Sequence, residues 1–412
     1  MPSKRPLGLE VAKMDLMPRV LLIIPTTSYR ATDFFEAAES LGIEVTVAAE
    51  EPLPLVAPER FVAIDCARPQ EAARAIVDLA TSTPIDAIVP VDDAGVMIAA
   101  LAAEELGLPH NRPSAAAATR NKALMRTLLA AAEVDQPSFA VTEGDGLAEA
   151  AKIGFPLVVK PLSLSGSRGV IRVNSSADLE GAIRMVRDIA GDPEILIEEF
   201  VFGPEVAVEG IVWNGELEVL AIFDKPDPLE GPFFEETIYV TPSTLDPPIQ
   251  TEVARVTQAA IAGLGLTEGP IHAELRIAPG GRPRLLEVAA RSIGGICGRS
   301  LNFGLLDTPL EALILRHALG RRASLPQKPG ASGVMMIPIP KRGILKGVDG
   351  IDSALEVVGI RSIEITMPPG TSIRPVPESD RYLGFIFASG PDPATVESSL
   401  RQAHSRLQID IA

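Results

Sequence analysis

The first quarter of the chain alternates short apolar runs with helical patterns, and this alternation constrains the fold more than any other feature. Val20–Ile24 and Ile85–Val91 are apolar runs typical of buried strands, and a helical pattern over 32–41 lies between them. Strands separated by helices predict a parallel, doubly wound α/β sheet. Ligands of such sheets gather at the carboxyl ends of the strands, where Asp92 and Asp93 stand. The stretch lacks a G-x-G-x-x-G turn, which argues against a dinucleotide site.

The pattern changes after residue 113. A single Ala- and Leu-rich helix is expected over 114–132, followed by hairpin signals to about residue 322. Asn214-Gly215 joins two alternating strands, and Asn-Gly is a strong hairpin cue. A second pair of strands meets at Pro279-Gly280-Gly281, and the last block mixes strands with helices. We therefore predict a tail over 1–17, an N-terminal α/β domain over 18–113, a middle domain with antiparallel sheets over 114–325, and a small C-terminal α+β domain over 326–412.

Charge and cysteine content exclude several classes of protein. The 412 residues carry 37 Lys and Arg against 54 Asp and Glu, a net charge of −17, so we expect no nonspecific nucleic-acid partner. Cys66 and Cys297 are the only cysteines, which excludes a disulfide framework and a cysteine zinc site. No apolar run approaches the about 20 residues that span a bilayer, and residues 1–16 lack the apolar block of a secretory signal. We therefore expect a cytoplasmic protein with no membrane partner, whose ordered fold begins at Met17.

A lysine closes one strongly apolar strand. Lys160 ends the run 155–161, and a buried ammonium group needs an anionic partner. The loop Ser163–Val170 follows, and its backbone N–H groups, its hydroxyls and Arg168 can surround phosphate oxygens. Its spacing is not that of a P-loop. Alone, the lysine could extend to solvent and the loop could be a simple hairpin turn, but together they predict one anion pocket.

Acidic residues follow another apolar strand. The run 195–197 leads into Glu198 and Glu199, whose side chains point to opposite faces of a strand. A carboxylate at this point can accept from an adenine amino group, and the backbone of 199–201 can meet the edge of the ring. Glu205 can accept from ribose hydroxyls. The alternative is a solvated strand end with ordinary surface acids.

Two further acids form the pair that most specifically predicts a functional site. Glu274 lies in one alternating strand and Glu287 in the next, and the Gly280-Gly281 turn folds these strands antiparallel. Adjacent carboxylates repel each other unless a proton or a cation lies between them. Oxygen-only ligands favour Mg²⁺. The alternative is a pair of salt bridges to Arg276 and Arg284.

Arg291 completes the set, because it follows Glu287 by four residues and can meet a charged reacting group. In order, these motifs resemble the ATP-grasp superfamily of carboxylate–amine ligases over residues 18 to 322. The last block resembles the small C-terminal domain of the L-amino-acid ligases. The motifs are specific for the superfamily and much less so for the substrate.

The resemblance implies ATP and Mg²⁺ as cofactors, with Mn²⁺ as an alternative ion. The middle domain would be the ATP-grasp domain, with a lid over about 135–197. Glu274 and Glu287 would ligate the metal, and Arg291 would stabilise the acyl phosphate and the tetrahedral intermediate. Lys160 would also serve catalysis. The implied nucleotide contacts are Lys122 and Lys160 on the phosphates, Ser165, Gly166 and Gly169 in the lid, and Glu198, Val201 and Glu205 on adenosine.

Two positions depart from the family pattern. Many relatives carry Asn two residues after the second metal acid, where this chain has Ala289. Glu236 is our candidate replacement as a metal ligand, because dipeptide-forming relatives resemble the chain there. Asn121 precedes Lys122 where Asp is common, and we expect this change to matter little.

The resemblance implies an ATP-dependent ligase that activates the carboxylate of an L-amino acid as an acyl phosphate and joins it to an amine. An amide or dipeptide, ADP and phosphate would result, and the partners would be the small-molecule carboxylate and amine; a homodimer is left open. One alternative is a carboxylase or purine-pathway type of ATP-grasp enzyme that activates bicarbonate or a small acid. The other is a nucleotide-binding regulator without catalysis, which predicts loss of a metal acid or of Arg291, and all three are present.

Overall fold

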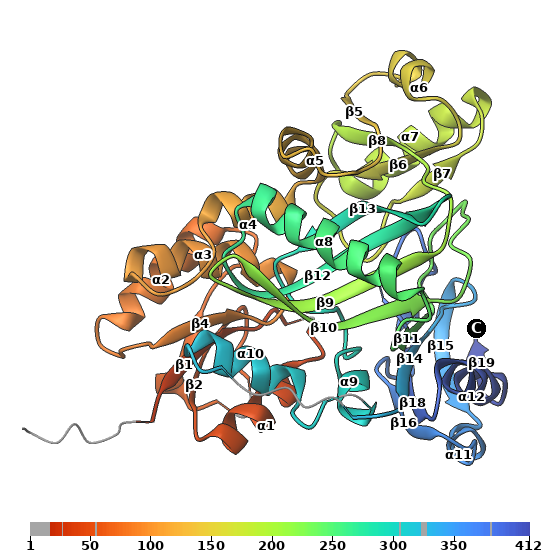
Figure 1. Ribbon diagram of the computed structural model, residues 1–412. Coiled ribbons are helices and arrows are strands. Elements are labelled where there is room, and N and C mark those ends of the chain that lie inside the picture. The colour runs from red at the N-terminus through yellow and green to blue at the C-terminus, as the bar shows by residue number, and fades with distance from the viewer. Residues whose placement is uncertain (1–16, 27, 54–55, 305, 323–327, 380) are drawn as a thin grey trace, which may run out of the picture.

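The computed structural model describes residues 17–412 except 27, 54–55, 305, 323–327 and 380 (Figure 1). Apart from Met17, the predicted tail lies outside the described residues. The domain boundaries at 113 and 325 stay predictions. No helix among the described residues has both the length and the apolar character needed to cross a membrane.

The N-terminal part is the predicted parallel sheet. Its strand order is β3-β2-β1-β4, and all pairs are parallel. Alternate residues of β1 enter two different cores: Leu22 packs in the cluster that holds Phe34 and Leu313, and Ile23 in the cluster that holds Ile76. This two-sided burial explains the unbroken apolar run. The elements are β1 (Arg19–Ile23), α1 (Ala31–Leu41), β2 (Glu44–Ala49), η1 (Pro58–Arg60), β3 (Phe61–Ala63), α2 (Pro69–Ala80), β4 (Ala87–Pro90) and α3 (Asp93–Leu106).

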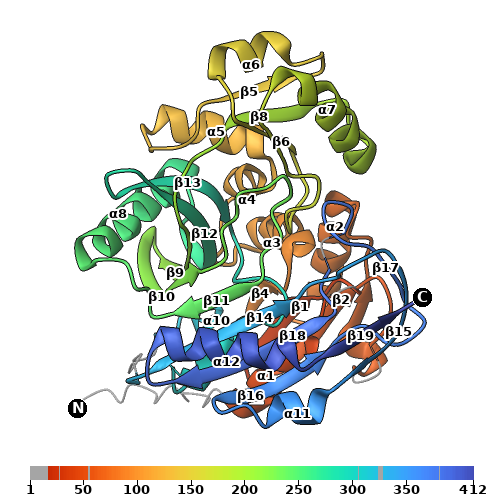
Figure 2. The ribbon, with the colours of Figure 1, turned by 90° about the vertical axis from the view of Figure 1, so that its right-hand side faces the viewer.

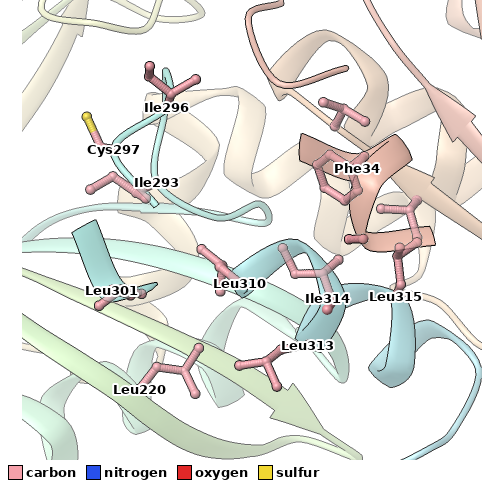
Figure 3. Packing of buried hydrophobic residues seen from close by; sticks show 14 of the residues in the cluster. Phe34, Leu220, Ile293, Ile296, Cys297, Leu301, Leu310, Leu313, Ile314 and Leu315 are labelled. Atoms are coloured by element: carbon pink, nitrogen blue, oxygen red, sulfur yellow. The ribbon is translucent and has the colours of Figure 1, made fainter. Parts of the chain in front are cut away.

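One of these cores joins distant parts of the chain. Phe34 of α1 packs in the same cluster as Leu310 and Ile314 of α10 (Leu310–Ala318), as Figure 3 shows. Leu220 of β10 (Glu216–Lys225) belongs to this cluster too. The N-terminal sheet is therefore anchored to the centre of the molecule by apolar contacts.

The single helix predicted over 114–132 is wrong, because the chain forms α4 (Pro113–Arg120) and α5 (Lys122–Ala131). Asn121 separates them with extended backbone angles, and its side chain accepts from the N–H of Leu124 at 3.0 Å. Asn is a preferred N-cap residue, and here this capping outweighs the helix propensity of the flanking alanines. The break places Lys122 at the start of α5.

A four-stranded sheet, here called the lid sheet, follows with the order β5-β8-β6-β7. All its pairs are antiparallel. Both views place it with α6 and α7 at one end of the molecule (Figures 1 and 2). Its elements are β5 (Phe139–Thr142), α6 (Leu147–Ile153), β6 (Leu157–Pro161), β7 (Ile171–Val173), α7 (Ser176–Ala190) and β8 (Ile195–Glu199).

The central sheet has eight strands in the order β13-β12-β9-β10-β11-β14-β18-β16. The two predicted hairpins are confirmed as β9–β10 and β12–β13. Its strands are β9 (Glu205–Trp213), β10 (Glu216–Lys225), β11 (Ile238–Thr241), β12 (Glu268–Ala278), β13 (Arg282–Ala289), β14 (Ala331–Ile337), β16 (Ile360–Ile365) and β18 (Gly384–Gly390), and α8 (Pro247–Leu264) packs on β10 and β13.

The C-terminal part is α+β as predicted, but three of its strands extend the central sheet. β11 pairs with β14 from Ile238 to Thr241, so the sheet continues across the predicted boundary. Figure 2 shows these strands side by side, with α12 in front of them. The remaining elements are α9 (Arg299–Gly304), β15 (Gly343–Asp349), α11 (Ile351–Leu355), β17 (Ser372–Ile373), α12 (Pro393–Ser405) and β19 (Gln408–Ile411).

Candidate active site

A cavity lies where the lid sheet meets β12 and β13. Its wall contains nearly every residue that the sequence assigned to the nucleotide or the metal: Lys122, Lys160, Ser165, Gly166, Glu198, Val201, Glu205, Glu236, Glu274, Glu287 and Arg291. Of the predicted set, Gly169 is not among the described wall residues, and its N–H donates to the carbonyl of Pro377 at 3.0 Å. The fold therefore brings together groups spread over about 170 positions of sequence.

A buried cluster at one end of the cavity carries excess positive charge. The Glu198 carboxylate lies 2.6 Å from Lys160 Nζ and 2.5 Å from Arg126 Nε, and all three side chains are buried. Burial opposes ionisation of Glu198, but the charges of Arg126 and Lys160 hold its pKa at about 2. One carboxylate faces two cations, so the cluster can attract an anion. Both oxygens of Glu198 already accept, and its predicted contact with adenine stays a prediction.

The lid loop, Ser163–Gly169, lines the same cavity as this cluster. The carbonyl of Leu164 accepts from Lys122 Nζ at 2.6 Å, and Ser165 and Gly166 line the cavity. The contact of Gly169 with Pro377 ties the far end of the loop to the C-terminal part. The loop is thus held at both ends in a position to cover a bound phosphate chain.

Glu205 lies between two cations. Its carboxylate is 2.7 Å from Lys225 Nζ and 2.9 Å from Arg276 Nε. Arg276 also donates to the carbonyl of Val201 at 2.9 Å, so it joins two of the three predicted adenosine residues, Val201 and Glu205. Their contacts with adenosine stay predictions.

Glu274 and Glu287 are directly opposed in the register of β12 and β13. Opposed residues of an antiparallel pair leave the same face of the sheet. Their side chains are 25% and 30% exposed, and both line the cavity. The alternative salt bridges are wrong, because Arg276 pairs with Glu205, and Arg284 pairs with Glu199 and Asp135. Arg284 lies 2.7 Å from Glu199 and 3.1 Å from Asp135.

The electrostatics of this pair fit a divalent ion. Burial would raise the pKa of Glu274, but the charge of Lys225 at 3.5 Å and a hydrogen bond with His272 hold it well below its usual range. Glu287 lies 3.2 Å from Lys122 Nζ. Two carboxyl groups that leave the same face of the sheet, at least one of them held ionised, offer the hard oxygen donors that Mg²⁺ prefers, and their role as metal ligands stays a prediction.

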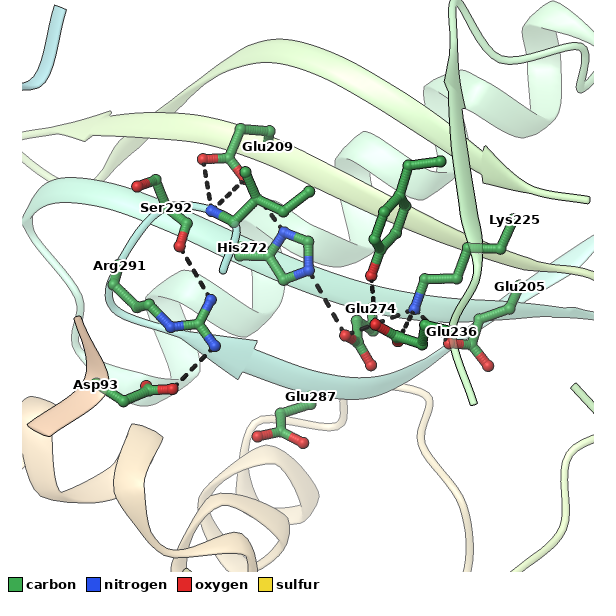
Figure 4. A network of polar contacts seen from close by, with 12 residues as sticks. Asp93, Glu205, Glu209, Lys225, Glu236, His272, Glu274, Glu287, Arg291 and Ser292 are labelled. Atoms are coloured by element: carbon green, nitrogen blue, oxygen red, sulfur yellow. Dashed lines mark hydrogen bonds and ion pairs between the residues drawn. The ribbon is translucent and has the colours of Figure 1, made fainter. Parts of the chain in front are cut away.

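Lys225 occupies the centre of a second acidic cluster. Carboxylate oxygens of Glu205, Glu236 and Glu274 lie within 4.8 Å of one another, and Lys225 Nζ is 2.5 Å from Glu236 (Figure 4). The hydroxyl of Tyr239 donates to Glu236 at 2.7 Å. Burial opposes the charge of Lys225, but Glu205 and Glu236 raise its pKa well above the usual value. An ammonium ion stands where a metal would, so Glu236 as a metal ligand stays a prediction.

Asp93 holds Arg291. Arg291 Nη2 is 2.9 Å from Asp93 Oδ2, and its Nη1 donates to the carbonyl of Ser292 at 2.9 Å. Burial opposes the charge of Asp93, but Arg291 and then Arg120 lower its pKa to about 2. The carboxyl end of the parallel sheet, where ligands of such sheets are expected, therefore meets the candidate site through Asp93.

His272 and Glu209 support the segment after β13. His272 Nδ1 lies 3.1 Å from Glu209, and Glu209 accepts from the N–H of Ile293 at 3.0 Å (Figure 4). Burial opposes protonation of His272, but its hydrogen bonds to Glu209 and Glu274 raise its pKa to about 9. Sequence reasoning missed Glu209, although an acid inside the apolar run 206–212 was a usable signal.

Family models match three parts of the chain. An ATP-grasp N-terminal domain matches residues 35–110, an ATP-grasp domain matches 153–300, and L-amino acid ligase C-terminal domain 2 matches 335–412. The solved L-amino acid ligase from Bacillus licheniformis superimposes with a TM-score of 0.83 at 28% identity. That likeness covers 96% of this chain and 99% of the other.

Two named relatives share part of their length with the chain. Alanine–anticapsin ligase from Bacillus subtilis (strain 168) is 30% identical over 55% of this chain and 52% of its own length. Carnosine synthase 1 from Homo sapiens is 26% identical over 76% of this chain and 41% of its own length. The chain therefore spans about half of these relatives or less.

Proposed function

Because the chain belongs to the ATP-grasp superfamily and ends in the C-terminal domain of L-amino acid ligases, we propose that it is an ATP-dependent carboxylate–amine ligase. Its carboxylate substrate is an L-amino acid, and the product is an amide or a dipeptide. One observation carries the proposal: the opposed pair Glu274 and Glu287 shares a cavity with Lys122, Lys160 and Arg291. Acyl phosphate chemistry needs acidic groups that bind a divalent ion, cations that bind the phosphates, and a cation that stabilises the reacting oxygen.

The reaction takes two steps. A carboxylate is a poor acyl donor because its leaving group would be oxide. Transfer of the γ-phosphoryl group of ATP to a carboxylate oxygen gives an acyl phosphate and ADP. The amine then attacks the carbonyl carbon, a tetrahedral intermediate forms, and the C–O bond to phosphate breaks, while the amine loses a proton.

The chain's own residues serve these steps in different ways. Lys122 and Lys160 neutralise charge on the phosphates, and Arg291, held by Asp93, faces the oxygen that becomes negative. The lid loop excludes water that would hydrolyse the acyl phosphate. Glu274 and Glu287 would hold Mg²⁺, or Mn²⁺ in its place, which supplies further neutralisation of the transferring group when bound.

The two alternatives predict different behaviour. A second cavity of about 420 Å³ adjoins the nucleotide cavity, and this is more room than bicarbonate requires. A regulator would not turn ATP over. Phosphate release should be measured with pools of amino acids, with bicarbonate and without substrate; stimulation by amino acids supports the ligase, and stimulation by bicarbonate alone contradicts it.

A cytoplasmic location and a homodimer remain part of the proposal, and light scattering tests the homodimer.

Replacing Lys160 with methionine should weaken ATP binding by about 10- to 100-fold. The substitution removes one of the two cations beside Glu198, and a charged hydrogen bond of this kind is worth about 1.5–3 kcal/mol. Calorimetry with a non-hydrolysable ATP analogue measures the effect. Lys152→Met, at an exposed position of the same lid, is the matched control. Equal affinity of the two variants would remove Lys160 from the nucleotide site.

A further inference from the structure

We propose that the amino acid activated by ATP carries a large apolar side chain, such as that of leucine, methionine or phenylalanine, and that the second cavity selects it. This inference rests on the proposed function. It adds the chemical class of the side chain, which the site's catalytic groups do not determine.

The two cavities meet at the reacting groups. The second cavity shares part of its wall with the nucleotide cavity, and the shared residues are Ser165, Gly166, Glu236, His272, Glu274 and Arg291. A carboxylate that receives the γ-phosphoryl group must lie at this boundary, beside Arg291. The rest of the amino acid therefore extends into the second cavity, whose volume of about 420 Å³ lies within the range of ligand pockets.

The wall that belongs to the second cavity alone combines apolar and aromatic side chains with four charged ones. Its seven apolar and aromatic residues come from five separate parts of the chain: Tyr29, Tyr239, Ile293, Cys297, Met336, Tyr382 and Phe385. All pack in or against the same hydrophobic core cluster, so the wall is the surface of a packed core rather than a mobile loop. The ring of Phe385 meets that of Tyr29 edge-on at 6.3 Å and that of Tyr382 at 6.4 Å. An apolar side chain placed on this wall gains about 25 cal/mol for each Å² removed from water.

Cys297 behaves as part of this apolar wall. Its side chain is buried, and burial raises the pKa of the thiol. A neutral thiol is a small apolar group. A charged substrate side chain would lose its hydration against the apolar part of this wall.

The charged groups that line the second cavity suit the ammonium and carboxylate groups of amino acids. Asp92 accepts from the N–H of Asp93 at 2.8 Å, which fixes its carboxylate at the cavity wall, where an ammonium group can bind. Arg168 and Arg381 also line the cavity; Arg381 is exposed and Arg168 is half-buried. These two cations suit the carboxylate of the second amino acid.

The experiment compares donors on the full chain with ATP and Mg²⁺. Leucine, methionine, phenylalanine, alanine and glutamate are supplied in turn with one common amine substrate, and tandem mass spectrometry reads the N-terminal residue of each dipeptide. We expect kcat/KM for the large apolar donors to exceed that for alanine and glutamate by about tenfold or more.

Cys297→Leu should lower the ratio of kcat/KM for phenylalanine to that for alanine by about tenfold, because it fills the cavity at its apolar wall. Cys66→Leu, the same change at the other cysteine and outside both cavities, should leave this ratio unchanged. If thermal unfolding shows that Cys297→Leu does not fold, Met336→Phe narrows the same wall. Preference for alanine or glutamate as the N-terminal residue, with dipeptides still formed, would overturn the inference and leave the ligase function standing. Failure of every amino acid to stimulate ATP cleavage would overturn both.

Discussion

Glu287→Gln should reduce kcat for phosphate release by about a thousandfold or more. The change keeps the shape of the side chain but removes one of the two charges opposed across β12 and β13. Metal-assisted charge stabilisation is worth several kcal/mol, and each 1.4 kcal/mol is about tenfold in rate. Since Glu287 is 30% exposed, the fold should survive.

Phosphate release under saturating ATP and amino acids measures this effect, and a thermal melt checks the fold. Glu216→Gln makes the same change at an exposed position of the central sheet and serves as the control. A folded Glu287→Gln variant with near-normal turnover would exclude a metal role for this carboxylate.

Arg291→Met should lower kcat by about 10²- to 10³-fold, with the affinity for an ATP analogue nearly unchanged. Loss of a group that stabilises a developing oxyanion typically costs this much. Asp93 keeps Arg120 as a partner at 3.1 Å, so the buried carboxylate is not left without a cation. The effect should therefore fall on the chemical step rather than on folding.

Steady-state kinetics and calorimetry on the same protein separate these two effects. Arg282→Met, at an exposed position where β13 begins, is the matched control. Arg291→Lys keeps the charge but not the guanidinium fork, and it should be intermediate. If Arg291→Met weakened nucleotide binding and left kcat intact, Arg291 would be a binding residue only.

Local patterns in the sequence were sufficient for the elements that carry the site. Strand alternation and the turn at Gly280-Gly281 predicted that Glu274 and Glu287 would meet, and the register confirms it. The apolar strand ending in Lys160 predicted a buried ammonium group with an anionic partner, which is Glu198. These features depend on contacts close in sequence or on residue types that are rare in their surroundings.

The partners that fix these groups could not be predicted in the same way. Arg126 lies on an ordinary helical face 72 positions before Glu198, and Asp93 is 198 positions from Arg291. No local pattern relates such residues. The position of the Lys225 ammonium could not be predicted either, because its three carboxylate neighbours come from different strands and loops.

The continuity of the central sheet across the predicted domain boundary also could not be predicted from the sequence. β11 and β14 are separated by about 90 residues, and nothing in either strand specifies its neighbour. The break at Asn121 is different, because an Asn before a helical pattern is a recognisable N-cap. The Ala- and Leu-rich surroundings outweighed that signal in the prediction over 114–132.

Soaking crystals with Mn²⁺ and a non-hydrolysable ATP analogue tests the central claim most directly, because the anomalous signal of manganese locates the ion independently of the chain. The account predicts one strong peak bound by oxygens of both Glu274 and Glu287 and by the phosphate chain. A peak bound elsewhere, with either of these carboxylates turned away from the nucleotide, would contradict it.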